Sequence, residues 1–254
     1  MLNLKSREAI RPLRRLGLCV IAPLVASCVL AQSSPTVQAP PADEIGPSGD
    51  VRWGAALKQS FLFLSIQHSL RLTQAKTRSQ LQGTFLKDYW SSIKNIHGWG
   101  DGDGVLTNYI AHPMQGGVSC FIQIQNDPDG IRREFGMNGG YWRSRFKAMG
   151  WAAAYSTQFE IGPVSEATIG HVGKREGTTG YSDLVVTPLG GLGLTVLEDA
   201  VDRFVISRLE SSGAGLASQR FLRVTLNPQR TLANLLRFKL PWHRDTRQLH
   251  RTQP

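Results

Sequence analysis

Residues 182–210 read SDLVVTPLGGLGLTVLEDAVDRFVISRLE and contain the longest apolar run beyond the N-terminal region. This segment predicts one long helix. We expect Pro188 and the glycines at 190, 191 and 193 to bend it or to let another backbone approach closely. The uncharged part, 184–197, has about 14 residues, fewer than the roughly 20 that a membrane-spanning helix needs. Its length therefore favours a buried core helix or a re-entrant segment.

Apolar residues recur at helical spacing along most of the remaining chain. In the clearest case, five of them between Leu81 and Ile96 are spaced 4, 4, 4 and 3 residues apart, the pattern of an amphipathic helix. Strand-like alternation is scarce, so the sequence predicts an all-α fold, a single compact bundle of kinked apolar helices. We expect the other helices at about 53–72, at 105–125 with a kink at Pro113, at 141–159 and from 228 onward.

The N-terminus has the three parts of an export signal. Five basic residues lie between positions 5 and 15, and an uncharged run follows from Leu16 to Leu30. Ala31 then stands where signal peptidase requires a small residue. We therefore expect residues 1–31 to be a signal peptide, which places the mature protein in the periplasm or on the periplasmic face of the envelope. The alternative is a lipoprotein, because residues 25–28 resemble a lipoprotein signal in which Cys28 would be acylated.

Composition divides the mature chain into three parts. Residues 32–51 are rich in Pro, Ser and Gly and predict a flexible linker, 52–226 predict the helical domain, and 227–254 predict a basic C-terminal helix and tail. Residues 220–254 carry eight basic residues and one acidic residue, whereas 32–219 carry 16 basic and 17 acidic residues. We expect the tail to bind an anionic membrane surface or lipid. An exported protein does not meet genomic DNA, so no nucleic-acid partner is expected, and any protein partner is unknown.

Asn108 and His112 lie four residues apart, which places them on the same face of the helix predicted at 105–125. Pro113 leaves a carbonyl one turn earlier without its amide donor, and a polar side chain or a ligand can use that carbonyl. Carboxylates further along the chain stand in otherwise apolar helices, where burial is costly unless they are paired. These carboxylates are Glu160, Glu166, Asp183 and Glu198. We expect them to converge on His112, on a cation, or on arginines such as Arg143 and Arg203.

Three interpretations of these polar residues stay open: a catalytic site, a cation site and a structural network. The catalytic candidates are His112, Glu160, Glu166 and Asp183, and the binding candidates are Asn108, His112 and Glu198. Asp101 and Asp103 resemble the start of a calcium loop, but Val105 stands where a further oxygen ligand belongs. We therefore predict no metal site and no cofactor. No common hydrolase, metalloprotease or nucleotide-binding motif is present, so the sequence leaves enzymatic activity undecided.

The pattern N-x-x-x-H-P-x-x-G at 108–116 is followed by Glu160, by the Ser-Glu pair at 165–166, and by D-L-V-V-T-P-x-G-G from Asp183. Over roughly residues 100–205, the chain resembles an uncharacterised family of exported bacterial proteins, one of the domains of unknown function. It is also faintly similar to VanZ-like helical membrane proteins, through Glu166, Asp183 and the glycine cluster. The resemblance implies an envelope location and a helical polar core, and no particular reaction.

Two functions fit these observations. The first is a helical envelope protein that docks on a membrane or on a partner through an apolar groove and its basic tail. The alternative is a periplasmic enzyme that acts on a lipid or cell-wall precursor, with His112 as base or ligand and a carboxylate orienting it.

Overall fold

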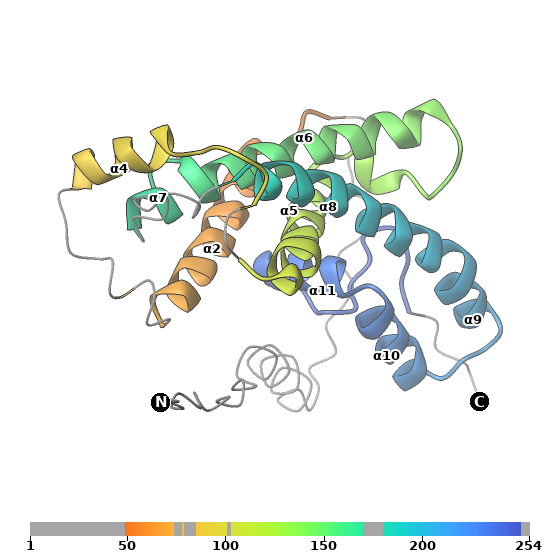
Figure 1. The fold of residues 1–254 in the computed structure, drawn as a ribbon. Helices are drawn as coiled ribbons and strands as arrows, with labels where there is room; N and C mark the ends of the chain where they lie inside the picture. Colours follow the sequence, from red (N-terminus) through yellow and green to blue (C-terminus); the bar gives the residue numbers. More distant parts are fainter. Residues whose placement is uncertain (1–48, 74–77, 79–84, 101–102, 170–179, 250–254) are drawn as a thin grey trace, which may run out of the picture. The chain divides into compact units, whose positions relative to one another are not determined.

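The computed structural model describes residues 49–73, 78, 85–100, 103–169 and 180–249. All regular elements within these residues are helical, which confirms the predicted all-α bundle (Figure 1). The described residues belong to one compact unit, Ile45–Pro254. The expected signal peptide, most of the expected linker and Asp101 lie outside the described residues.

The helices lie close to the positions that the apolar periodicity predicts. They are α2 (Trp53–Leu72), α4 (Phe85–Lys94), η2 (Thr107–Ala111), α5 (His112–Asn126), η3 (Gly130–Arg132), α6 (Gly139–Ile161), α7 (Glu166–Ile169), α8 (Ser182–Val201), η4 (Asp202–Ile206), α9 (Ser207–Ser211), α10 (Leu216–Leu226) and α11 (Pro228–Leu236). α8, η4 and α9 follow one another without a break and form a single helix over Ser182–Ser211.

The helix α5 forms the centre of the bundle. Each of its residues except Met114 is buried, and it packs against α2, α6, α8 and α11 (Figure 1). Its apolar side chains form the main hydrophobic core with Ala148 and Ala152 of α6 and with Ala233 and Leu236 of α11. The helix α11, which belongs to the predicted tail, is therefore part of the core.

The predicted kink near Pro113 takes the form of a π-helical turn. In η2 the helix widens over Thr107–Ala111, and the amide of His112 donates to the carbonyl of Thr107, five residues earlier. Proline has no amide hydrogen, so the carbonyl of Tyr109 cannot receive the ordinary helical bond from residue 113. A π turn is one way to reorganise the hydrogen bonds at such a position. The π turn ends directly before His112.

The helix α8 buries its polar face. Apart from Pro188, its buried residues are small or polar: Ser182, Asp183, Thr187, Gly191, Thr195, Glu198 and Asp199. Its apolar side chains are exposed or half-buried, and Leu189 and Leu197 are 56% and 58% exposed. The helix α2 is similar, since it buries Gln59 and His68 while Phe61 is 64% exposed. This arrangement is the reverse of a surface helix in a water-soluble domain.

Candidate functional site

The close approach of α5 and α8 places the candidate residues together. The two helices run in the same direction where they touch. Pro113 lies against Gly190, and further along both helices the Cys120 thiol interacts with the Thr195 hydroxyl. A methyl group on Gly190 would lie 2.7 Å from Cγ of Pro113, so a larger residue there would push the helices apart. The first turn of α5 therefore lies at short range from the middle of α8.

His112 lies between two groups of α8. Its Nε2 atom is 3.5 Å from Oδ1 of Asp183, and its Nδ1 atom is 3.3 Å from the hydroxyl oxygen of Thr187. Both His112 and Asp183 are buried, and the hydroxyl of Ser182 donates to Oδ1 of Asp183 at 3.3 Å. With each ring nitrogen placed beside a different polar group, the imidazole has a defined orientation.

Glu160, in the last turn of α6, adds a third side chain whose oxygen could bind a cation. The donor atoms of His112, Glu160 and Asp183 all lie within 4.8 Å of one another, and Glu160 is the partly exposed member. Two zinc ligands at tetrahedral angles stand about 3.4 Å apart, and the distance between His112 and Asp183 is compatible with that spacing. The same geometry suits a histidine base oriented by a carboxylate. The sequence predicted no metal site, yet these three residues have the donor types and spacing for a cation.

Glu166 joins this site through Arg71, which the sequence did not single out. Arg71 at the end of α2 donates to both carboxylate oxygens of Glu166 and lies 3.8 Å from Asp103. Burial opposes the charge on Arg71. The carboxylates of Glu166, Asp103 and Glu160 outweigh that cost and raise the pKa of Arg71. The influence of Glu160 on Arg71 links this ion pair to the His112 cluster.

The other candidates have separate places. Asn108 is buried on η2, one turn before His112. Glu198 is far from the cluster, because it follows Asp183 by 15 residues on the same helix, a rise of about 22 Å. Its carboxylate accepts the amides of Gln229 at 2.7 Å and Arg230 at 3.1 Å, so it caps α11 instead of joining His112. Burial raises the pKa of Glu198 to about 7, although the two hydrogen bonds favour the charged carboxylate and act in the opposite direction.

The expected arginine partners do not pair with these carboxylates within the described residues. Arg143 is exposed on α6, and Arg203 donates to the backbone carbonyl of Phe135. The arginine that α6 buries is Arg145, which donates to Asp199 at 2.7 Å and is 2% exposed. The sequence carries one signal for it, since Arg145 is three and seven residues before Ala148 and Ala152, on the face that packs against the core.

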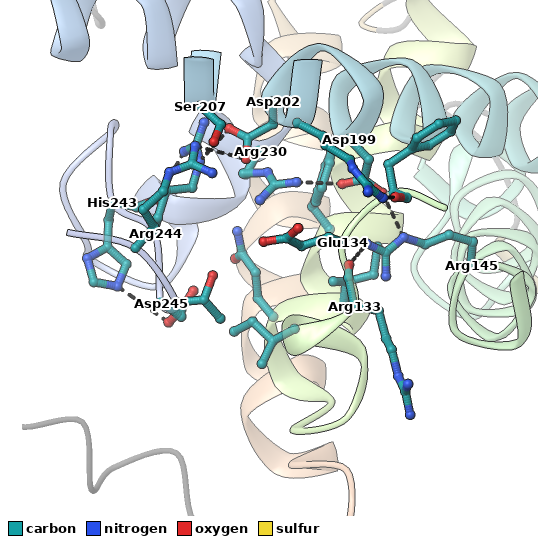
Figure 2. A pocket seen from close by; sticks show the side chains of 18 of the residues that line it. Arg133, Glu134, Arg145, Asp199, Asp202, Ser207, Arg230, His243, Arg244 and Asp245 are labelled. Atoms are coloured by element: carbon teal, nitrogen blue, oxygen red, sulfur yellow. Dashed lines mark hydrogen bonds and ion pairs between the residues drawn. The ribbon is translucent and has the colours of Figure 1, made fainter. Parts of the chain in front are cut away.

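A second polar site lies at the other end of α8 and in η4. Seven arginines line a pocket there, together with the carboxylates of Glu134, Asp199, Asp202 and Asp245 (Figure 2). The cavity volume of the pocket is about 60 Å³, and the pocket is open to solvent. The sequence predicted no such pocket, because its charged residues come from a loop, from α6, α8, η4 and α11, and from the C-terminal segment.

Comparison with family models, with curated proteins and with solved structures gave no match for the chain. The resemblance noted above therefore stays a prediction. The observations that bear on function are the geometry of these two sites and the exposed apolar surface.

Proposed function

We propose that this chain is an exported helical protein of the bacterial envelope that docks on a lipid membrane through the apolar face of α8. The observation that carries the proposal is the inverted polarity of α8. Its fully buried side chains are mostly polar or small, whereas Leu189 and Leu197 face outward. Burying apolar surface stabilises a protein by about 25 cal/mol for each Å² removed from water. A large exposed apolar face therefore indicates a surface that a membrane or a partner covers.

Length and burial favour a lipid cover. By length and composition, Ser182–Ser211 could cross a membrane, and only 33% of its most apolar window is buried. The core helix of a water-soluble protein that meets the same criteria is mostly buried. Because the opposite face of α8 packs on α5 and α6 and carries carboxylates, we propose that α8 lies against the bilayer instead of crossing it.

Exposed aromatic residues support the same proposal. Trp53 of α2, Trp90 of α4 and Trp99 of the following loop are each more than half exposed. The indole nitrogen of Trp99 donates to the exposed hydroxyl of Tyr109 at 2.9 Å. Tryptophan and tyrosine side chains are enriched at the boundary between lipid and water, where an apolar ring and a polar group are both satisfied.

The basic tail contributes less free charge than its sequence implies. Arg223, Arg230, Arg237, Arg244 and Arg247 all form ion pairs with carboxylates of the described residues. Charges that are already paired attract an anionic surface weakly. We therefore expect the apolar face, and not the tail, to contribute most of the binding energy for the membrane.

Flotation with phosphatidylcholine vesicles, which carry no net charge, tests this proposal. The mature chain should float with the vesicles at high salt, because apolar burial is not screened. Replacing Leu189 and Leu197 together by serine should reduce partitioning by tenfold or more, since burial of each side chain is worth about 1.5–3 kcal/mol. The control is Met137→Ser, in a loop residue that is 84% exposed.

Failure of the native chain to float would contradict the proposal, as would equal flotation of the double variant. Flotation only with anionic vesicles, and its loss at high salt, would favour the tail as the anchor. Export is tested separately by the intact mass of envelope-extracted protein. A mature N-terminus at Gln32 is expected, and an acylated form starting at Cys28 would identify a lipoprotein.

A second candidate function is an enzyme that acts on an envelope lipid or cell-wall precursor. The convergence of His112, Glu160 and Asp183 favours it, because this set can transfer a proton or hold a cation beside a partly exposed carboxylate. Incubation with a total bacterial lipid extract, followed by mass spectrometry, tests for turnover of a lipid. A product formed by the native chain and absent with His112→Asn supports the enzyme, whereas identical lipid profiles count against it.

A further inference from the structure

The pocket in Figure 2 has an excess of positive charge. Its lining contains seven arginines and four carboxylates, a formal excess of three positive charges before His243 is considered. The arginines come from separate parts of the chain: Arg133, Arg145, Arg203, Arg230, Arg237, Arg244 and Arg247. A group bound here would therefore meet guanidinium groups from several directions.

The carboxylates of the pocket are shared between guanidinium groups. Asp199 accepts from Arg145 at 2.7 Å and from Arg230 at 2.5 Å. Asp202 accepts from Arg244 at 3.2 Å and from Arg247 at 3.1 Å. Arg247 also pairs with Glu210, outside the lining, at 2.8 Å. Asp199 and Asp202 are thus each shared by two arginines, and the lining itself has more guanidinium groups than carboxylates.

Donors are left over at the pocket. Among the described residues, the Nε atoms of Arg230 and Arg237 are buried and have no hydrogen-bond partner, although both side chains line the pocket. Arg203 also lines it and forms no ion pair with a carboxylate of the described residues. The hydroxyls of Ser207 and Thr246 add neutral donors.

Two features show how the unbalanced charge acts within the pocket. Burial, together with the neighbouring Arg230, lowers the pKa of Arg244 to about 9, so the positive charges repel one another. Glu134 is exposed and lines the pocket (Figure 2). Its negative charge would repel an external anion that enters the pocket.

We propose that this pocket binds a phosphate group, either as free phosphate or as the headgroup of a phospholipid. A phosphate has several oxygens and up to two negative charges, and the planar guanidinium fork binds such groups through two parallel hydrogen bonds. The negative charge of a phosphate would balance part of the excess positive charge of the pocket lining. This inference goes beyond membrane docking and does not depend on it, since the pocket is built by residues other than the exposed leucines of α8.

Calorimetric titration of the untagged mature chain with inorganic phosphate, at constant ionic strength and without vesicles, tests the pocket. Saturable binding at one site is expected, and Arg230→Gln should weaken it at least tenfold. Because Arg230 also pairs with Asp199, that variant risks misfolding, so Arg203→Gln at the rim serves as the second variant and should weaken binding severalfold. Arg143→Gln, which removes an exposed arginine of α6 outside the pocket, should leave the affinity unchanged.

Glu134→Gln provides a variant with the opposite sign. It raises the excess charge from three to four, so phosphate should bind severalfold more tightly than to the native chain. A parallel titration with dihexanoyl phosphatidic acid below its micelle concentration separates the two sources of phosphate. Tighter binding than inorganic phosphate, with the same response to Arg203→Gln, identifies a lipid headgroup, and equal or weaker binding identifies free phosphate. Absence of binding by both ligands, or affinities that Arg203→Gln and Glu134→Gln do not change, would overturn the proposal.

Discussion

Gly116 of α5 and Gly191 of α8 pack backbone against backbone. A methyl group on Gly191 would lie 2.4 Å from the carbonyl carbon of Gly116, and one on Gly116 would lie 1.9 Å from the carbonyl oxygen of Thr187. The contact is one turn beyond His112 on α5 and one turn beyond Thr187 on α8. The glycine pair thus fixes the separation at which His112 meets Asp183 and Thr187. Small residues spaced by four along two helices are also the usual means of close packing inside membranes.

Gly191→Ala should be strongly destabilising. The new methyl group meets backbone atoms that cannot move aside, so we expect a loss of about 3 kcal/mol in the free energy of unfolding. Gly193→Ala is the matched control, because nothing lies within 4 Å of a methyl group there and the helix gains about 0.5–1 kcal/mol. Thermal melts of the two variants should shift in opposite directions. Equal melting temperatures would mean that the helices are free to separate.

His112→Ala should cost about 1–3 kcal/mol of stability, because it removes the imidazole that lies between Asp183 and Thr187. Thr187→Val removes only the hydroxyl and should cost less. If the two side chains form one network, the double variant should lose less than the sum of the single losses in urea unfolding. A His112→Ala protein as stable as the native chain would exclude a structural role and strengthen the case for binding or catalysis.

The sequence predicted where the helices lie better than which face they bury. Helix positions follow from periodicity and from Pro and Gly, and 182–210 is nearly the observed 182–211. In α6, however, Trp142 and Phe146 share an apolar face, while the structure buries the face with Tyr141 and Arg145. Patterns of apolar residues assume a dry apolar core, and this bundle has charged and polar groups inside. The periodicity alone therefore could not identify the buried side.

The candidate site was predictable only in part, because most of its residues are far apart in the sequence and meet only through helix packing. Asn108 and His112 had to share a face because they are four residues apart. His112 and Asp183 meet because two helices approach closely at glycines, and the cluster at 190–193 signalled such an approach. Glu198 was misplaced because 15 residues of helix separate it from Asp183. The arginine pocket depends on tertiary contacts of the C-terminal segment, which no local pattern in the sequence encodes.

Acid should unfold the protein partly through Asp202. Burial opposes its ionisation, but Arg230, Arg244 and Arg247 outweigh that effect and lower its pKa from 3.8 to about 2. A lowered pKa means that the native state keeps the charge while the unfolded chain binds a proton. The resulting stability, about 2 kcal/mol, is complete above pH 3.8 and is lost as the pH falls to 2.

Urea unfolding between pH 6 and pH 2 measures this contribution. Asp202→Asn should be less stable than the native chain at pH 6 and should lose less stability between pH 4 and pH 2. Part of the loss of stability in acid should persist in the variant, because the pKa of Asp245 is lowered too. Burial opposes the ionisation of Asp245, but hydrogen bonds from His243 and Arg237 outweigh that effect. Asp129→Asn, at an exposed turn, should follow the native curve. Parallel curves for the native chain and Asp202→Asn would refute the assignment.

Truncation after Leu226 should prevent folding, although the sequence places a domain boundary there. The truncated chain lacks α11, so the core loses Ala233 and Leu236, and Asp199 loses its ion pair with Arg230. Glu198 would be left as a buried carboxylate without the two amides that it accepts from α11. Breaking a buried ion pair alone costs about 3–5 kcal/mol, and a typical domain has only about 5–15 kcal/mol of stability in total.

Circular dichroism during heating separates the two outcomes, with a chain that ends at Leu249 as the control. The control keeps every contact of the described residues and should melt cooperatively, close to the native temperature. The chain that ends at Leu226 should show reduced helix signal and no cooperative transition. A cooperative melt from that shorter chain would establish residues 227–254 as a separate tail. In that case the folded shorter chain could be compared with the native chain in vesicle binding. A loss of binding on truncation would identify the basic segment as the anchor, and unchanged binding would favour the leucines of α8.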